Sequence, residues 1–251
     1  MTDDEWAYFE PFLIRRGGRP PRNHRRALDA VFWQMRTGAP WRDLPEELGN
    51  WNSIFRQFRR WADSGVFDVI LEALVGSGAC NAALQMVDAT IIRAHHCAGG
   101  GKGGAERNAL GRSRGGYSTK INARTNAEGL PIGLVITPGQ AHDVTAFPAL
   151  MQEVDCDPEQ LLGDKGYDSD AVRQEIADHG GEALIPTKAN RKIQYTVDKA
   201  IYGLRNRIER FFNRLKNSRR VATRYDKLIE SFVAFVILAT IRIWIRFVHG
   251  T

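Results

Sequence analysis

Near its C-terminal end the chain reads Tyr202-Gly-Leu-Arg205-Asn-Arg-Ile-Glu209-Arg-Phe-Phe-Asn-Arg-Leu-Lys216. Its apolar side chains recur every three or four residues, which predicts an amphipathic helix over residues 197–217. At about 100° per residue, four polar side chains fall within about 60° of one another on this helix: Tyr202, Arg205, Glu209 and Lys216. Glu209 is the single acid of the stretch, so the role of its carboxylate is the first question that the sequence raises.

The charges of the chain are unevenly distributed. Residues 1–80 carry 11 basic and 11 acidic side chains, residues 81–190 carry 10 and 14, and residues 191–251 carry 14 and 4. An acidic middle beside a strongly basic end suits a protein that grips a polyanion and holds cations nearby. On composition alone, a basic helix that is merely solvated is the alternative.

Cysteine usage and hydropathy both favour a cytoplasmic protein without membrane association. The three cysteines form no paired-cysteine metal motif, and a reducing setting is the default expectation. The first residues, Met-Thr-Asp-Asp-Glu-Trp, are acidic, unlike the basic start of a secretory signal. The most apolar run, residues 232–245, has about 14 residues where a membrane span needs about 20, which predicts a buried helix.

Residues 1–78 are predicted to form a small all-helical domain. Helix signals occur over residues 2–14, 25–37, 52–63 and 66–75. The first two helices flank a segment, broken by Gly and Pro, whose basic residues have no acidic neighbours: Arg15, Arg16, Arg19 and Arg22. Short helices with an arginine-rich loop fit a helix-turn-helix-like DNA-binding domain, with these arginines as DNA contacts. A helical cap that only packs on the next domain is the alternative.

From residue 82 the pattern changes to alternating strands and helices, which predicts an α/β domain over residues 82–251. Strands are predicted over residues 84–94, 118–124, 130–137, 160–164 and 182–186. Helices are predicted over residues 144–154, 169–178, 197–217 and 226–247. The resulting order is β-β-β-α-β-α-β-α, followed by a C-terminal helix.

Two acids occur where apolar strands would not place them. Asp88 interrupts Met-Val and Ala-Thr-Ile-Ile, and Asp164 follows Leu-Leu-Gly at the end of a strand. A charge in or beside a buried strand is costly unless it is paired or binds a metal ion. With Glu209 these acids would form an all-oxygen site, which suits Mg²⁺ or Mn²⁺, and two such ions would activate a phosphodiester bond. The alternatives are that Asp164 caps the next helix and that Glu209 forms a surface ion pair.

The spacing of these residues is a motif in itself. The four polar residues follow the pattern Tyr202-x₂-Arg205-x₃-Glu209-x₆-Lys216, and the aspartates occur in Val-Asp88-Ala-Thr and in Leu-Gly-Asp164-Lys-Gly-Tyr-Asp. They resemble the Y-(2)-R-(3)-E-(6)-K signature and the aspartate contexts of bacterial insertion-sequence transposases of families four and five. Residues 39–45 and 111–120 resemble family five most closely. The order of strands, helices and acids also looks like the RNase H-like mixed sheet of DDE transposases.

The resemblance implies an active DDE transposase. Asp88, Asp164 and Glu209 would hold two divalent ions, Mg²⁺ or Mn²⁺, and Glu209 would face the other acids instead of its arginine neighbours. The enzyme would nick double-stranded DNA at the terminal inverted repeats and join the freed 3′-hydroxyl ends to target DNA. A homodimer or a higher oligomer is expected to bring the two ends together.

The same resemblance suggests supporting roles for other residues. The transposon end would be contacted by Tyr202, Arg205 and Lys216, which can supply stacking, bidentate phosphate contact and a point charge. Candidates for supporting the acids are His142, Asp143 and Lys165.

Two other functions fit the same fold: a metal-dependent nuclease such as a junction resolvase, and a non-catalytic DNA-binding protein derived from a transposase. The Tyr-Arg-Glu-Lys spacing argues against the first, and the presence of all three acids argues against the second.

Overall fold

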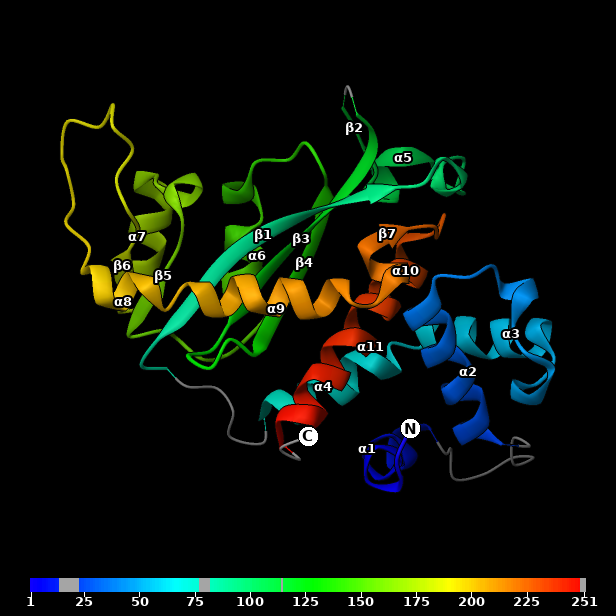
Figure 1. Ribbon diagram of the computed structural model, residues 1–251. Helices are drawn as coiled ribbons and strands as arrows, with labels where there is room; N and C mark the ends of the chain where they lie inside the picture. The colour runs from blue at the N-terminus through cyan, green and yellow to red at the C-terminus, as the bar shows by residue number, and fades with distance from the viewer. Residues whose placement is uncertain (14–22, 77–81, 114, 249–251) are drawn as a thin grey trace. The chain divides into compact units, whose positions relative to one another are not determined.

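The computed structural model describes residues 1–13, 23–76, 82–113 and 115–248 (Figure 1). The DNA-contacting candidates Arg15, Arg16, Arg19 and Arg22 lie outside these residues. Contacts within the chain form two compact units. The first unit consists of Met1–Leu74, His95–Lys102 and Leu215–Thr251, and the second of Val75–Ala94 and Gly103–Arg214. The predicted domain boundary between residues 78 and 82 stays a prediction, and each unit is described by itself.

The first unit contains the four predicted N-terminal helices: α1 (Asp3–Leu13), α2 (His24–Thr37), α3 (Trp51–Asp63) and α4 (Val66–Gly76). Short 3₁₀ helices link or flank them: η1 (Trp41–Asp43), η2 (Glu46–Leu48) and η3 (His96–Ala98). The C-terminal part adds α10 (Arg219–Ala222), β7 (Thr223–Arg224) and α11 (Ile229–Val248). Helix α2 ends at Gly38, whose φ of 68° is the left-handed conformation that glycine adopts without strain.

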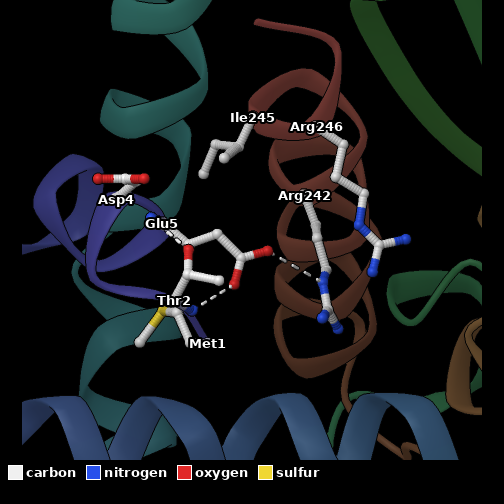
Figure 2. Close-up of a pocket in the computed structure, with 7 residues that line it drawn as sticks. All are labelled: Met1, Thr2, Asp4, Glu5, Arg242, Ile245 and Arg246. Carbon is white, nitrogen blue, oxygen red and sulfur yellow. Dashed lines mark hydrogen bonds and ion pairs between the residues drawn. The ribbon is translucent and has the colours of Figure 1, made fainter. Parts of the chain in front are cut away.

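The start of α1 is held by side chains (Figure 2). The Glu5 backbone N–H donates to the Thr2 hydroxyl at 3.1 Å, and the Thr2 N–H donates to the Glu5 carboxylate at 3.0 Å. This reciprocal capping satisfies two backbone donors that a helix start otherwise leaves free. The same Glu5 carboxylate lies 3.8 Å from the guanidinium of Arg242 on α11.

Helix α11 is longer than the predicted apolar run. It has 20 residues, enough to cross a membrane by length and composition, and 72% of its most apolar window is buried inside the protein. The helix predicted over residues 226–247 is confirmed as α11 (Ile229–Val248), and Arg242 does not interrupt it: its guanidinium lies over the Phe32 ring, 5.3 Å from the ring centre. The burial agrees with the predicted core helix. Phe235 of α11, for example, stacks on Phe58 of α3 with ring centres 4.5 Å apart.

The second unit is built on a mixed sheet in the order β2-β3-β1-β5-β6, with β4 also paired to β3. Its strands are β1 (Gln85–Ala94), β2 (Gly111–Ser113), β3 (Gly116–Thr125), β4 (Pro131–Pro138), β5 (Gln160–Leu162) and β6 (Glu182–Leu184). Strands β1, β3 and β4 are antiparallel neighbours, whereas β1, β5 and β6 run parallel. The predicted strand order is confirmed, with the short β2 as an addition.

The helices of this unit connect the strands. They are α5 (Gly104–Arg107), α6 (Phe147–Gln152), α7 (Asp170–Asp178), α8 (Lys199–Gly203) and α9 (Asn206–Lys216), with 3₁₀ turns η4 (Asp143–Thr145) and η5 (Lys165–Tyr167). The last two residues of α9 are grouped with the first unit. A buried guanidinium ties the sheet to α6, because Arg124 of β3 donates to the Gln85 side chain at 2.5 Å and to the Met151 carbonyl at 3.1 Å. In Figure 1, α9 runs along the face of the strands β1, β3 and β4.

The single helix predicted over residues 197–217 is wrong in one respect. The structure has two helices, α8 and α9, with a turn at Leu204 and Arg205 between them. Both sides of the break have 3₁₀ hydrogen bonds, from Arg205 N–H to the Tyr202 carbonyl and from Ile208 N–H to the Arg205 carbonyl, each 3.1 Å. The break places Arg205 directly before α9.

Candidate active site

Asp88 lies within the central strand β1, opposite Ala123 of β3. Its side chain is 14% exposed, and one carboxylate oxygen accepts the backbone N–H of Ala89 at 2.9 Å. A mostly buried carboxylate on the central strand needs a cationic partner, because desolvation of an unpaired charge is costly.

Asp164 lies beside Asp88 because β5 runs parallel to β1. The last residue pair between these strands is Met86 with Leu162, and each aspartate follows two residues later. The Asp164 carboxylate accepts the Gly166 N–H at 2.7 Å and caps the 3₁₀ turn η5, whereas the next predicted helix, α7, is capped by Ser169. The capping bond fixes the carboxylate at the end of β5.

Arg205 joins two of the three acids. Its guanidinium donates to Asp88 at 2.9 Å and to Glu209 at 2.6 Å. Arg205 is 17% exposed, whereas Glu209 is half exposed at 50%. The expectation that Glu209 faces away from its arginine neighbours is therefore wrong in this structure, because the turn before α9 points Arg205 towards the acids.

The pKa of Asp88 shows that the three acids share one electrostatic environment. Burial raises the pKa of this carboxyl to about 6, against the opposing effects of Arg205 and of the Ala89 hydrogen bond. The negative charges of Asp164 and Glu209 raise the pKa further. Burial also raises the pKa of Tyr202, and the same three acids add to this rise. The structure thus brings Tyr202 and Arg205 into the neighbourhood of the acids.

The donor set of the site is made of carboxylate oxygens, the ligands that Mg²⁺ and Mn²⁺ prefer. A cation already lies between Asp88 and Glu209, because the Arg205 guanidinium contacts both. In this side-chain arrangement, no group of three His, Cys, Asp or Glu residues within the described ranges is placed to hold a metal ion. The chemistry of the acids fits a divalent cation.

The structure adds a second ion pair on the Asp164 side of the site. Asp143, at the start of η4, accepts from the Lys120 ammonium of β3 at 2.5 Å. The turns η4 and η5 pack together, and carboxylate oxygens of Asp143 and Asp164 lie 3.5 Å and 2.7 Å from the position that a Cβ on Gly166 would occupy. Sequence reasoning singled out Asp143 but missed Lys120. Lys120 lies in a predicted strand of alternating polar and apolar residues, and this pattern does not indicate that its ammonium group is buried.

Tyr167 was missed as well. This residue has no exposed surface, and its hydroxyl has no hydrogen-bond partner among the described residues. Burial raises the pKa of Tyr167 well above its usual value, and the negative charges of Asp143, Asp88 and Asp164 add to this rise. The feature that singles out Tyr167 is a buried hydroxyl beside three acids, without a hydrogen-bond partner among the described residues. This feature can be recognised only in the tertiary structure.

The other candidates lie further from these contacts. His142 and Lys165 are exposed, and neither makes a side-chain hydrogen bond or ion pair within the part of the chain that the structure describes. Lys216 is half-buried at the last position of α9, seven residues and about 10 Å along the helix from Glu209.

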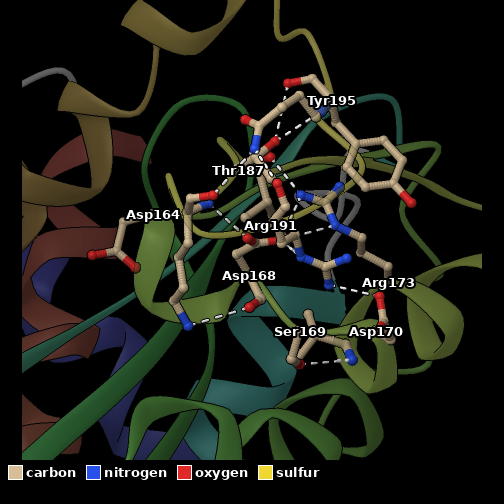
Figure 3. Close-up of polar contacts among 12 residues, drawn as sticks. Asp164, Asp168, Ser169, Asp170, Arg173, Thr187, Arg191 and Tyr195 are labelled. Atoms are coloured by element: carbon tan, nitrogen blue, oxygen red, sulfur yellow. Dashed lines mark hydrogen bonds and ion pairs between the residues drawn. The ribbon is translucent and has the colours of Figure 1, made fainter.

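A polar network follows Asp164 in the chain (Figure 3). The buried Asp168 carboxylate accepts from Arg173 at 2.9 Å and from the Lys188 backbone N–H at 2.8 Å, and it pairs with Arg191 at 3.1 Å. These contacts outweigh the opposing effect of burial and lower the pKa of Asp168. The network anchors the segment between β6 and α8 to the start of α7. Asp164 stands apart from it in Figure 3.

Two family profiles match the chain. The family profile described as "Transposase DDE domain" matches residues 82–244, and that described as "Putative transposase of IS4/5 family" matches residues 1–71. The mixed sheet with its acids is of the RNase H-like transposase class. The chain belongs to the transposase DDE domain family, whose members are divalent-metal-dependent enzymes that act as insertion-sequence transposases in bacteria.

Two relatives illustrate the match. The "Putative transposase for insertion sequence element IS6501" of Brucella ovis is 35% identical over 130 residues, which is 51% of this chain and 99% of that protein. An uncharacterized protein of Sinorhizobium fredii is 42% identical over 107 residues, which is 41% of this chain and 82% of that protein.

The solved structure of the piggyBac transposase synaptic complex with hairpin DNA shares the fold of this chain, with a TM-score of 0.55 and 11% identity. The alignment covers 98% of this chain and 71% of the piggyBac chain. The predicted RNase H-like mixed sheet is confirmed.

Proposed function

We propose that this chain binds the terminal inverted repeats of a bacterial insertion sequence, nicks them and joins the 3′-hydroxyl ends to target DNA. The observation that carries the proposal is that Asp88 and Glu209 share the guanidinium of Arg205, while Asp164 follows the strand beside that of Asp88. These carboxylates come from the central strand, from its parallel neighbour and from the helix that follows the sheet. The same three acids were selected from the sequence for metal-dependent phosphodiester chemistry.

Asp88, Asp164 and Glu209 would hold two divalent ions, Mg²⁺ or Mn²⁺. When bound, such ions polarise a phosphodiester, activate the attacking water or hydroxyl and stabilise the leaving oxygen. The protein's own part is positional: β1 and β5 hold two carboxylates at neighbouring places, and the Gly166 N–H orients one of them. Arg205 neutralises Asp88 and Glu209 while no metal ion is bound, which keeps like charges together at a tolerable cost.

The DNA would lie along the α8–α9 edge of the site. Tyr202 and Arg205 are already beside the acids, and Lys216 adds a cation at the far end of α9. The double-stranded transposon end is the proposed ligand of these three residues. The piggyBac structure that shares the fold is described as a synaptic complex with hairpin DNA, which supports DNA as the partner. A homodimer or higher oligomer is the proposed working form, because two element ends must be brought together.

The test uses the full chain with a labelled duplex that carries the element end, with Mg²⁺ or with a chelator. Asp88→Asn and Glu209→Gln are expected to bind the duplex as the wild type does and to lose nicking and strand transfer. The matched control is Glu106→Gln, which removes an exposed acid that lies at least 18 positions along the chain from each of the three carboxylates. Nicking that persists at the wild-type rate in Asp88→Asn would overturn the proposal.

A further inference from the structure

Helix α9 has a basic face that the three-acid site does not use. At about 100° per residue, Arg207, Arg210 and Arg214 lie roughly 100° to 160° around the helix from Glu209. The apolar residues occupy the remaining sector on the other side of Glu209 and are buried: Ile208, Phe211, Phe212 and Leu215. The arginine face is therefore directed neither to the acids nor to the core.

These arginines line a hollow on the second unit. A cavity of about 350 Å³ is bordered by Arg207, Arg210 and Arg214 of α9 and by Glu128 of the β3–β4 turn. The guanidinium of Arg207 donates to the Ala127 carbonyl, which ties the helix to this turn. At Gly129, whose φ is 79°, a Cβ would lie 2.8 Å from the Arg207 carbonyl oxygen. Only glycine allows this close approach, so helix and turn form one rigid wall.

The charges of this wall are unbalanced. Arg210 and Arg214 are exposed, and within the described ranges neither side chain forms an ion pair or a hydrogen bond. Glu128 is the single acid of the cavity lining. Cations three and four residues apart on a helix repel one another, so the row lowers helix stability unless an anion binds there. Arg205, in contrast, has its charge matched by two carboxylates.

We propose that Arg207, Arg210 and Arg214 form a second DNA-binding surface, which takes the phosphate backbone of duplex DNA without regard to sequence. The proposal rests on the proposed function in that it takes DNA as the partner of the chain. Guanidinium groups bind phosphate oxygens in a bidentate manner. From Arg207 to Arg214 the helix rises about 10 Å, a length that about three successive nucleotides of one strand cover.

The arginine surface and the proposed DNA contacts beside the acids lie on different sides of α9. A phosphate bound by Arg210 or Arg214 is on the other polar side of α9 from a phosphate beside Asp88 and Glu209. The basic face therefore holds a stretch of duplex away from the cut bond. Three of the four lining side chains are arginines, which can bind phosphate oxygens, and phosphate contacts carry no direct sequence information.

The experiment measures the affinity of the full chain for a random-sequence duplex without element ends over a range of salt concentrations. Each phosphate contact contributes about −0.9 to the slope of log K against log salt. The double variant Arg210→Gln with Arg214→Gln is expected to reduce the slope by about 2. Arg207 is left in place because its guanidinium supports the turn. The double variant Arg210→Lys with Arg214→Lys keeps both charges and is expected to restore the slope, which shows that the effect is one of charge and not of folding.

The matched control is Arg107→Gln with Arg112→Gln, which removes the same charge from two exposed arginines outside α9. The proposal is supported if this control keeps the wild-type slope, and it is overturned if the control lowers the slope as much as the α9 variant does. An unchanged slope in the α9 glutamine variant also overturns it, even where nicking still depends on Asp88. If nicking is independent of Asp88 but the α9 glutamine variant still has a reduced slope, the proposed catalytic function is overturned. The proposed DNA-binding surface on α9 is then still supported.

Discussion

The guanidinium of Arg205 contacts the carboxylate of Asp88 at 2.9 Å, although the two residues are 117 positions apart in the chain. The same guanidinium reaches Glu209 one helical turn later. A residue predicted to touch DNA therefore also balances the charge of two proposed metal ligands. Loss of Arg205 would therefore change the ionisation of Asp88 and Glu209, which the loss of a DNA contact alone would not do.

Replacement of Arg205 by Gln is expected to move the pH dependence of nicking. The cation lowers the pKa of Asp88, so its removal raises this pKa above the value of about 6. Because Asp88 must be ionised to hold a metal ion, the midpoint of the pH–rate profile at limiting Mg²⁺, which reports the metal-free protein, moves to higher pH. Arg210→Gln removes a cation from the same helix and should leave the midpoint unchanged. A midpoint that is equal in wild type and Arg205→Gln would contradict the pairing.

The stability of the metal-free protein is expected to fall as the pH rises from about 4 to 6. Burial raises the pKa of Asp88 from the usual 3.8 to about 6 in the folded state, so between these pH values the folded state binds more protons than the unfolded state. The loss attributable to this group reaches about 3 kcal/mol at neutral pH, as an order of magnitude. Asp88→Asn should remove that part of the slope, as followed by urea unfolding at several pH values in chelator. Parallel profiles for wild type and variant would show that Asp88 is not desolvated.

Asp168→Asn is expected to destabilise the chain by about 3 to 5 kcal/mol, since it leaves the mostly buried guanidinium of Arg173 without its carboxylate. The control is Asp170→Asn, which removes the 89%-exposed partner of Arg191 and should cost less than about 1 kcal/mol. The pKa of Asp168 is lowered in the folded state, so its contribution is present above the unfolded pKa and disappears as the pH falls through the folded value. Equal unfolding midpoints for the two variants would contradict this assignment.

Tyr167→Phe is expected to leave the metal-free protein as stable as the wild type or to stabilise it by about 1 kcal/mol. The hydroxyl is buried and has no partner among the described residues, so its removal loses no hydrogen bond of the protein and relieves a desolvated polar group. Chemical unfolding measures the difference. Val172→Ala, which removes buried carbon atoms from the same cluster, is the control and should destabilise the protein. A clear loss of stability in Tyr167→Phe would reveal a partner for the hydroxyl.

Sequence by itself determined the order of the elements and the identity of the three acids. Strand and helix periods are local properties of ten or so residues, so the β-β-β-α-β-α-β-α order was predictable before any contact was known. The acids stood out for a similar reason. Asp88 breaks an apolar strand, Asp164 follows one, and Glu209 is the lone acid of a basic helix. The fixed spacing of the four polar residues from Tyr202 to Lys216 also indicated the transposase family.

Tertiary structure alone decided which charges meet. Lys120 pairs with Asp143 across 23 positions, and Arg205 pairs with Asp88 and not solely with its helical neighbour Glu209. Neither pair follows from local patterns, because each depends on the strand register and on the turn that separates α8 from α9. The grouping of residues 215–251 with the N-terminal helices was likewise invisible in the sequence. Apolar periodicity shows that a helix is buried, but the partner that buries it is set by packing over the whole chain.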